Sequence, residues 1–432
     1  MKKVFMSFST DIIHGGHIRI IQEAAKLGEL TIGVLTDKVV AGYKRFPILS
    51  VKERIDIISG ITGVSDVAEQ HSLVGEDLLR RLKPDYLVHG DDWKTGVQSS
   101  ARARVIEILS EWGGELREFP YSKNREYDAL ERHARSQLSI PDARRGRLKK
   151  LLALKPLVTA IEVHSGLTGL LAENEKVVKA DGAVSQFDAM WISSLCDSVA
   201  KGKPDTELVD MTSRLRTIDD VMEVTTKPII FDGDTGGQVD HFSYLIKTLE
   251  RIGVSAVIIE DKTGVKRNSL FGTEVIQQQD SIEHFSAKIA SGKSAMKTRE
   301  MMLVARIESL ILERGMDDAL ERAFAFVQAG ADGIMIHSRR KEPDEIFNFC
   351  REFRAKDLST PLVVVPSTFT SVTEDEFARR GVNIVIYANQ LTRSAFPAMQ
   401  QTARLILEHN RAQEADRLCM SINEIIKLIP EI

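Results

Sequence analysis

The sequence has few cysteines, little net charge and no long apolar run, and each of these absences excludes a class of protein. Its 432 residues include three cysteines, Cys196, Cys350 and Cys419, which are far apart in the chain. Cysteines so placed form neither a disulfide framework nor a zinc-binding spacing, so we expect a reducing compartment, the cytoplasm. The formal net charge is -4, which gives no reason to expect nucleic acid as a partner.

No stretch approaches the roughly 20 apolar residues that a membrane-spanning helix needs. The first apolar run, in MKKVFMSFSTDII, is interrupted at Ser7, Ser9, Thr10 and Asp11, which makes it too short for a signal peptide. We therefore expect no membrane insertion. With 43% hydrophobic and 28% charged residues the chain is expected to fold. At roughly 100–200 residues per domain, its length predicts two or three domains.

Short apolar runs alternate with amphipathic helical patterns over residues 1–121, which predicts a Rossmann-like α/β domain. We expect strands over residues 3–8, 30–37 and 85–89, and helices over residues 17–27, 52–61, 76–82 and 98–112. Residues 122–152 are polar and arginine-rich, and Pro141 and Gly146 interrupt them. We expect this segment to be a partly helical linker whose charged face is solvated.

A second pattern of apolar runs and helix-compatible segments begins near residue 153, in the part of the chain that continues to residue 432. Eight β-rich apolar runs follow one another, most of them separated by helix-compatible segments; they cover residues 158–163, 189–193, 228–231, 256–259, 303–307, 333–336, 362–365 and 383–387. Eight βα units in one block predict a (β/α)₈ barrel of the TIM type. Reactive groups in such a barrel lie at the C-terminal ends of the strands.

Polar residues follow five successive strands of this predicted barrel. They are Ser193, Ser194, Asp232, Asp234, Glu260, Arg306 and His337. Three carboxylates at one mouth would repel one another without a cation between them, and hard oxygen ligands favour Mg²⁺. Neighbouring cations and neutral donors, among them Lys266, Asn268 and Ser269, suit a phosphoryl or carboxylate group. Any single one of these residues could merely cap the following helix, but five successive strand ends together favour a site for an anionic substrate.

Residues 260–269, EDKTGVKRNS, resemble the EDKxxxKxNS signature of phosphoenolpyruvate mutase, in the isocitrate lyase/phosphoenolpyruvate mutase superfamily. The resemblance extends over roughly residues 155–430. It includes DxDTG at residues 232–236, VAR at residues 304–306 and the HS pair at residues 337–338.

This resemblance implies a role for each matching residue. Asp232 would bind Mg²⁺ directly, while Asp234 and Glu260 would hold the water molecules of the metal. Substrate binding would fall to Trp191, Ser193, Ser194 and Leu195. The catalytic set would be Asp205, a mobile aspartate proposed as nucleophile or phosphoryl anchor, together with Arg306, His337, Asn268, Lys266 and Ser269. Residues 266–269 would lie on a lid that excludes water.

The implied reaction interconverts phosphoenolpyruvate and 3-phosphonopyruvate, the first step of phosphonate biosynthesis. Water is the competing nucleophile, so phosphonopyruvate hydrolase is the alternative if the lid admits it. Lyases of the superfamily carry a cysteine in a KKCGH-like loop, where this chain has Thr263, Gly264 and Val265, so lyase activity is not expected. The resemblance also implies a homo-oligomer, dimer or tetramer, whose last helices are exchanged between barrels; the amphipathic run over residues 395–407 is compatible with this.

The first predicted strand is followed by a second motif. Histidines three residues apart with glycines between them, at a helix N-terminus, make a phosphate site. The motif resembles the HxGH sequence of the cytidylyltransferase superfamily, and GDDW at residues 90–93 supports the match over about residues 1–120. The resemblance implies a site for CTP made of Thr10, Asp11, His14, Gly16, His17, Lys44, Asp91 and Asp92.

One part of this second family pattern is missing. Where the family has an RTEGISTT-like segment, residues 119–127 read FPYSKNREY and lack the Gly-Ile-Ser-Thr core. Three interpretations therefore stay open: an active CTP:phosphonate cytidylyltransferase, a nucleotide-binding but inactive domain, and a remnant that helps assembly.

Overall fold

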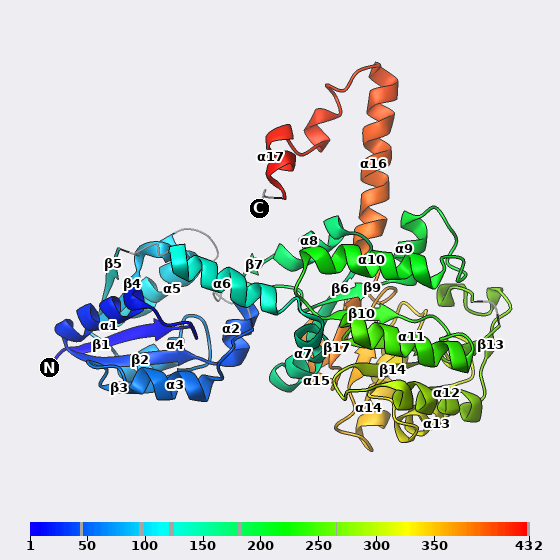
Figure 1. Cartoon of the computed structure of the whole chain (residues 1–432), viewed down its shortest axis with the longest axis horizontal. Coiled ribbons are helices and arrows are strands. Elements are labelled where there is room, and N and C mark those ends of the chain that lie inside the picture. Colours follow the sequence, from blue (N-terminus) through cyan, green and yellow to red (C-terminus); the bar gives the residue numbers. More distant parts are fainter. Residues whose placement is uncertain (44–45, 95–98, 121–124, 180–183, 265, 430–432) are drawn as a thin grey trace.

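The computed structural model has two α/β parts, a five-stranded parallel sheet and a closed eight-stranded barrel (Figure 1). It describes residues 1–432 except 44–45, 95–98, 121–124, 180–183, 265 and 430–432. Both the Rossmann-like sheet and the barrel are as predicted. No helix in these described ranges combines the length and the apolar character needed to cross a membrane.

The N-terminal sheet has the strand order β3-β2-β1-β4-β5, and every neighbouring pair is parallel. Its strands are β1 (Lys3–Phe8), β2 (Glu29–Leu35), β3 (Asp66–Gln70), β4 (Tyr86–Gly90) and β5 (Glu115–Phe119). The helices around it are α1 (Gly15–Leu27), α2 (Asp37–Tyr43), α3 (Val51–Ser59), α4 (Glu76–Leu82), the 3₁₀ helix η1 (Asp91–Lys94) and α5 (Ser99–Ser110). All seven predicted elements are present.

Three elements of this sheet have no counterpart in the predictions. The two edge strands, β3 and β5, have the sequences DVAEQ and ELREF and are only partly buried. Each pairs with one neighbour and is partly exposed to solvent at the edge of the sheet. Its sequence therefore carries no continuous apolar run. Helix α2 begins at Asp37, the last residue of the expected strand over residues 30–37, so the prediction ended that strand two residues too late.

Two helices follow the sheet, α6 (Arg125–Gln137) and α7 (Pro141–Leu154). Pro141 is the first residue of α7, where its missing N–H costs nothing. The expectation of a solvated charged face was wrong for this helix, because Arg144 is fully buried. Its guanidinium donates to Thr225 Oγ1 at 3.1 Å and also to the Thr225 carbonyl oxygen. Since Thr225 precedes a barrel strand, α7 covers the N-terminal end of the barrel.

The closed barrel has the strand order β6-β9-β10-β11-β14-β15-β16-β17 and is parallel throughout. The strands are β6 (Val158–Val163), β9 (Ala189–Ile192), β10 (Ile229–Asp232), β11 (Ala256–Glu260), β14 (Met302–Ile307), β15 (Gly333–Ile336), β16 (Leu362–Val364) and β17 (Ile384–Tyr387). All eight apolar runs read from the sequence are therefore confirmed as barrel strands.

Helices surround the barrel, and short elements extend from it. The helices are α8 (Gly166–Asn174), α9 (Ser194–Ala200), α10 (Met211–Val224), α11 (Val239–Ile252), α12 (Ile282–Ala295), α13 (Met316–Gln328), α14 (Asp344–Arg354) and α15 (Glu374–Arg379). The short elements are the β7 (Val177–Val178) and β8 (Val184–Ser185) pair, the β12 (Lys262–Thr263) and β13 (Gln278–Gln279) pair, and the 3₁₀ helix η3 (Ser269–Glu274). The chain ends in α16 (Gln390–His409), η4 (Asp416–Leu418) and α17 (Ile422–Lys427).

The barrel core has two layers of apolar side chains. One fills the space between strands and helices and includes Phe231, Phe242 and Phe285, all fully buried. The other fills the barrel interior and includes Trp191. Burying one such side chain contributes about 1.5–3 kcal/mol, so this packing holds the strand ends, and the residues that follow them, in fixed positions.

The N-terminal sheet domain contacts the barrel at the end that α7 covers. Lys176 Nζ donates to the carbonyl oxygen of Tyr43 at 3.1 Å, and Gln186 Nε2 donates to that of Ala41 at 3.0 Å. Lys176 and Gln186 both precede β9, so these contacts lie at the N-terminal ends of the strands. The C-terminal mouth of the barrel is therefore left to the barrel's own loops.

Candidate active site at the barrel mouth

The loop after β10 brings two carboxylates to the mouth of the barrel. Gly233 separates them and packs against β11, where a Cβ atom would lie 2.9 Å from Ile259 Cγ2 and 3.0 Å from the Ile258 carbonyl oxygen. Only glycine fits this approach. Asp234 has a φ of 54°, in the left-handed region that is uncommon for residues other than glycine. The tight turn keeps Asp232 and Asp234 both buried at the mouth.

One cavity at the mouth collects nearly all residues expected to form the site. Its lining includes Trp191, Ser193, Ser194, Leu195, Asp205, Asp232, Glu260, Lys266, Asn268, Ser269, Arg306 and His337. Asp234 does not line the cavity but contacts Lys266, which does. Asn389 and Ser367 also line it, and neither was expected from the sequence, because neither lies in a matching motif.

The acidic side of this cavity holds a buried ammonium group. Lys266 Nζ lies 2.9 Å from Asp205 Oδ1 and also contacts Asp234 Oδ1 and Ser194 Oγ. Asp232 Oδ2 accepts hydrogen bonds from the backbone N–H of Ser194 at 3.2 Å and from its hydroxyl at 2.8 Å. The cation among these carboxylates is therefore Lys266, which was expected from the sequence with the groups that hold the anionic substrate.

Asp232 and Glu260 differ in their protonation. Burial raises the pKa of Asp232, but Lys266, Arg214 and Arg306 outweigh burial and lower it to about 2. Burial dominates at Glu260 and raises its pKa to about 7, although Arg306 and Lys262 oppose it. Burial lowers the pKa of Lys266, yet the surrounding carboxylates raise it above its ordinary value. At neutral pH the site therefore contains an ionised Asp232 beside a partly protonated Glu260.

The acidic residues fit a cation that keeps much of its water. Within the described ranges, no three histidine, cysteine or acidic side chains converge closely enough to hold a metal by themselves. Glu260 Oε1 is buried without a hydrogen bond there, although Lys262 Nζ lies 3.3 Å away. Such an unpartnered carboxylate oxygen fits Mg²⁺, which binds through one or two carboxylates and retains several waters.

The opposite side of the cavity carries the basic groups. Arg306 Nη2 lies 2.6 Å from Ser269 Oγ and 2.9 Å from His337 Nδ1. A guanidinium cannot accept a hydrogen bond, so His337 Nδ1 accepts and the ring proton of the neutral form lies on Nε2. Burial and the nearby Arg306 lower the pKa of His337, which favours that neutral form. The site can thus offer a guanidinium and a neutral imidazole donor to an anion.

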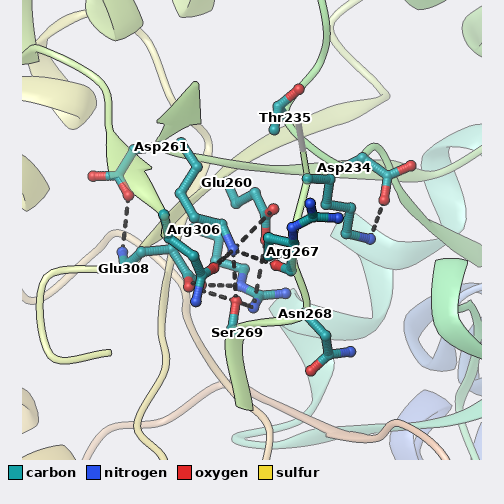
Figure 2. Close-up of polar contacts among 12 residues, drawn as sticks. Asp234, Thr235, Glu260, Asp261, Arg267, Asn268, Ser269, Arg306 and Glu308 are labelled. Atoms are coloured by element: carbon teal, nitrogen blue, oxygen red, sulfur yellow. Dashed lines mark hydrogen bonds and ion pairs between the residues drawn. The ribbon is translucent and has the colours of Figure 1, made fainter. Parts of the chain in front are cut away.

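Glu308 organises these basic groups and was missed by the sequence analysis. It is fully buried; its Oε1 accepts from Arg306 Nε at 2.6 Å, and its Oε2 accepts from Ser269 Oγ at 2.5 Å (Figure 2). Arg306 and the neighbouring cations hold the pKa of Glu308 well below its usual range despite its burial. A signal was available, because Glu308 follows Arg306 by two residues, and side chains two apart along an extended chain share a face.

Residues 266–269 fold over the cavity. Lys262 Nζ donates to the Arg267 carbonyl oxygen at 2.9 Å and to Ser269 Oγ at 3.0 Å. Asn268 Nδ2 donates to Asp205 Oδ2 at 3.0 Å. This segment therefore bridges from the strand end at Lys262 to Asp205, on the far side of the mouth. We call residues 266–269 the lid.

In the N-terminal domain the structure brings the two histidines together at the start of α1. The rings of His14 and His17 lie 3.9 Å apart, and His14 Nδ1 accepts from the backbone N–H of Gly16 at 3.0 Å. A separate cavity beside the carboxyl ends of β1, β2 and β4 is lined by Ser7, Ser9, His89 and Trp93, among others. It lies where the strand order reverses, the usual ligand position in such sheets.

Of the other residues expected at the nucleotide site, some form hydrogen bonds with neighbouring loops and some lie outside the described residues. Asp11 Oδ2 accepts from the backbone N–H groups of Ile48 and Leu49, and Thr10 Oγ1 accepts from the Ile12 backbone. Asp91 begins η1. Lys44 and the side chain of Asp92 are outside the described part of the chain.

A barrel whose mouth joins buried carboxylates to an arginine and a histidine defines an enzyme of the phosphoenolpyruvate mutase/isocitrate lyase superfamily. The chain belongs to the phosphoenolpyruvate phosphomutase family, whose sequence profile matches residues 148–407. Residues 9–132 match the cytidylyltransferase-like profile. Both resemblances read from the sequence are therefore confirmed.

Individual relatives include a mutase and a hydrolase. The phosphoenolpyruvate phosphomutase of Tetrahymena pyriformis is 34% identical over 283 residues, 65% of this chain and 90% of that protein. The phosphonopyruvate hydrolase of Variovorax sp. (strain Pal2) is 35% identical over 274 residues, 63% of this chain and 90% of that protein. A crystal structure of phosphonopyruvate hydrolase in complex with oxalate and Mg²⁺ has a TM-score of 0.55 and 33% identity, covering 63% of this chain and 89% of that one. Overall identity thus does not separate the two activities.

Proposed function

We propose that the barrel is a Mg²⁺-dependent phosphoenolpyruvate mutase, which interconverts phosphoenolpyruvate and 3-phosphonopyruvate as the first step of phosphonate biosynthesis. The observation that carries this proposal is the lid, which is joined to Asp205 through Asn268 and to Glu308 through Ser269. Moving a phosphoryl group without losing it to water requires a covered site. Hydrogen bonds on both sides of the mouth provide that cover.

Asp232 would bind Mg²⁺ directly, and Asp234 and Glu260 would hold its waters. When bound, the ion would stabilise negative charge on the carboxylate and carbonyl oxygens of the substrate. Ser193, Ser194 and Leu195 line the same part of the cavity and would orient the substrate carboxylate. The hydrolase relative whose structure contains oxalate and Mg²⁺ supports this pairing of ligand and ion.

The chain's basic groups would hold the phosphoryl group during its transfer. Arg306 and the Nε2–H of His337 supply a positive charge and a donor, and Asn268 of the lid lines the same cavity. The transferred group breaks its bond to the oxygen on carbon two and forms one to carbon three. Both carboxylate oxygens of Asp205 accept bonds from the lid, so in this arrangement Asp205 anchors the lid.

The test is to incubate the protein with phosphonopyruvate, with Mg²⁺ or with EDTA, and to follow the products by phosphorus NMR. Phosphoenolpyruvate that appears only with Mg²⁺ is the expected result. The Asp232→Ala variant is expected to be inactive because it loses the direct metal ligand, and near-wild-type turnover in it would refute the metal assignment.

The second candidate for the barrel is phosphonopyruvate hydrolase, which the 35% identical relative favours. The same cavity residues would serve, and water would attack the phosphoryl group. In the same NMR experiment this activity gives inorganic phosphate and pyruvate in place of phosphoenolpyruvate.

For the N-terminal domain we propose binding of CTP, and transfer of its CMP part to an oxygen of a phosphonate such as 2-aminoethylphosphonate, with release of pyrophosphate. The paired histidines at the N-terminus of α1 and the cavity at the strand-order reversal support it. Residues 119–127 lack the family's Gly-Ile-Ser-Thr core, so binding is tested first. Calorimetry with CTP is expected to show saturable binding, and no detectable heat would leave an assembly role.

We also propose that the chain forms a dimer or tetramer through its C-terminal helices. Helix α16 projects away from the barrel (Figure 1) and has no buried residue, while Phe396, Met399 and Leu407 on it are exposed. A single chain leaves these side chains in water, whereas exchange of helices between barrels would cover them. Light scattering of the full chain and of a variant with Phe396→Lys and Leu407→Lys tests this: the variant is expected to be monomeric.

A further inference from the structure

Asp234 is held from behind by a buried arginine on α10. Arg214 is 2% exposed, and its Nη1 donates to Asp234 Oδ2 at 2.6 Å. Its guanidinium also lies over the ring of Phe231 at 4.3 Å from the centroid. Its role cannot be read from the sequence, because nothing in the local sequence of a helix indicates a contact with a loop 20 residues away.

The carboxylate of Asp234 is divided between two cations. Oδ2 faces Arg214, and Oδ1 contacts Lys266 of the lid. Arg214 belongs to the barrel wall, in a helix that begins with the side-chain cap of Asp210, whereas Lys266 belongs to the segment that covers the mouth. Arg214 therefore holds Asp234 from the barrel wall, independently of the lid.

Arg214 depends strongly on this one contact. Its Nε and Nη2 have no hydrogen-bond partner among the described residues, and the nearest other carboxylate, Asp197, lies 4.0 Å away. Asp197 Oδ1 accepts from Lys201 and from Thr217 Oγ1 at 2.7 Å, while its Oδ2, the oxygen that faces Arg214, makes no hydrogen bond among the described residues. Breaking a buried ion pair by moving one partner away is strongly destabilising. The short ionic contact of Arg214 therefore fixes the position of the Asp234 carboxylate.

The backbone conformation of Asp234 also requires stabilising contacts from its surroundings. Its φ of 54° places it in the left-handed region, which a residue other than glycine keeps only when its surroundings enforce it. Arg214 enforces it through the side chain, while the carbonyl oxygen of Asp234 accepts from the backbone N–H of Glu260 at 2.8 Å. The turn and its carboxylate are thus fixed from two directions.

We propose that Arg214 is a positioning residue, which fixes Asp234 so that Oδ1 is presented to the metal site. This inference rests on the proposed Mg²⁺ site. Groups that orient metal ligands from behind typically change metal affinity by about 10–100-fold when they are removed. Charge alone would act in the opposite direction, because removing a cation near a cation site raises the affinity for the metal, so the sign of the change separates the two effects.

The experiment measures Mn²⁺ binding by electron paramagnetic resonance, on the full chain and without substrate, so that it does not depend on turnover. The variants are Arg214→Met, Arg214→Lys, and the exposed neighbour Arg216→Met as a matched control. Circular dichroism and thermal unfolding check that each variant is folded. We expect Arg214→Met to bind Mn²⁺ about 10–100-fold more weakly, Arg214→Lys to lose less, and Arg216→Met to match wild type.

A second pair of variants tests whether the effect passes through Asp234. In an Asp234→Asn background, Arg214→Met is expected to change the Mn²⁺ affinity less than threefold. An equal loss in both backgrounds, an unchanged affinity in Arg214→Met, or a tighter affinity in it would each overturn the positioning role. Absence of Mn²⁺ binding by wild type would instead refute the proposed metal site, and the inference with it.

Discussion

Replacing Glu308 by glutamine should slow the enzyme while leaving its fold intact. The substitution keeps the size of the side chain and converts one carboxylate oxygen to an amide nitrogen, which cannot accept a hydrogen bond. In the wild type, Glu308 accepts hydrogen bonds from both Arg306 Nε at 2.6 Å and Ser269 Oγ at 2.5 Å. One of these two donors therefore loses its acceptor in the variant.

The size of the effect follows from the kind of contact that is lost. A hydrogen bond to a charged group contributes about 1.5–3 kcal/mol. If this energy orients Arg306 and the lid serine Ser269 in the transition state, its loss lowers kcat/KM by roughly 10–150-fold, since 1.36 kcal/mol is tenfold. The loss should fall mainly on kcat, because the proposed role of Arg306 is to hold the phosphoryl group while it moves.

The assay follows the conversion of phosphonopyruvate by phosphorus NMR for wild type and Glu308→Gln. The matched control is Glu313→Gln, a residue on the same turn that is 58% exposed and pairs with Arg339 at 3.1 Å. The control should stay within twofold of wild type. A Glu308→Gln variant that is folded and as active as the control would refute the argument that Glu308 organises the basic side of the site.

Three further predictions concern the lid, the helix under the barrel and a buried lysine. Asn268→Ala removes the contact with Asp205 and should raise the share of phosphonopyruvate that ends as inorganic phosphate, measured by phosphorus NMR. Arg144→Met leaves buried carbonyl oxygens without donors and should lower the free energy of unfolding by about 1–3 kcal/mol in urea denaturation, whereas Lys150→Met on the exposed face of α7 should not. Burial lowers the pKa of Lys227 from 10.5 to about 8; the unfolded chain then binds more protons between these values, so wild type should gain about 2 kcal/mol of stability over Lys227→Met between pH 7.5 and 9.5.

Each of these has a result that contradicts it. An unchanged product ratio in Asn268→Ala would show that the lid does not exclude water through that contact. Equal stability of Arg144→Met and Lys150→Met would remove the structural role of the buried guanidinium. A stability difference between wild type and Lys227→Met that stays constant with pH would show that burial does not perturb the lysine.

Much of the barrel could be predicted because its strands are buried on both faces. Such strands read as continuous apolar runs, and all eight were found where the structure has them. The edge strands β3 and β5 could not be found this way, since they are polar and half-exposed. The sequence of α7 was misleading for a related reason: a charged helix is usually solvated, but Arg144 meets Thr225, 81 residues further on.

The residues of the site also fall into those that could be predicted from the sequence and those that could not. Residues that follow barrel strands must meet at one mouth, so Asp232, Glu260, Arg306 and His337 could be grouped from their positions alone. Arg214 could not, because it reaches Asp234 from a helix outside the strands. Long-range contacts of this kind depend on packing that no local pattern specifies.

The most direct test of the central claim is the fate of the phosphoryl group in ¹⁸O-labelled water. Phosphonopyruvate, Mg²⁺ and the wild-type protein are mixed, and the products are separated and examined for the label by mass spectrometry. The proposed mutase gives phosphoenolpyruvate as the main product, with no ¹⁸O in its three non-bridging phosphoryl oxygens and little inorganic phosphate. The bridging oxygen comes from the ketone carbonyl, which exchanges with water, and is left out of the comparison. Pyruvate with ¹⁸O-labelled phosphate as the main products would contradict the proposal and make the barrel a hydrolase.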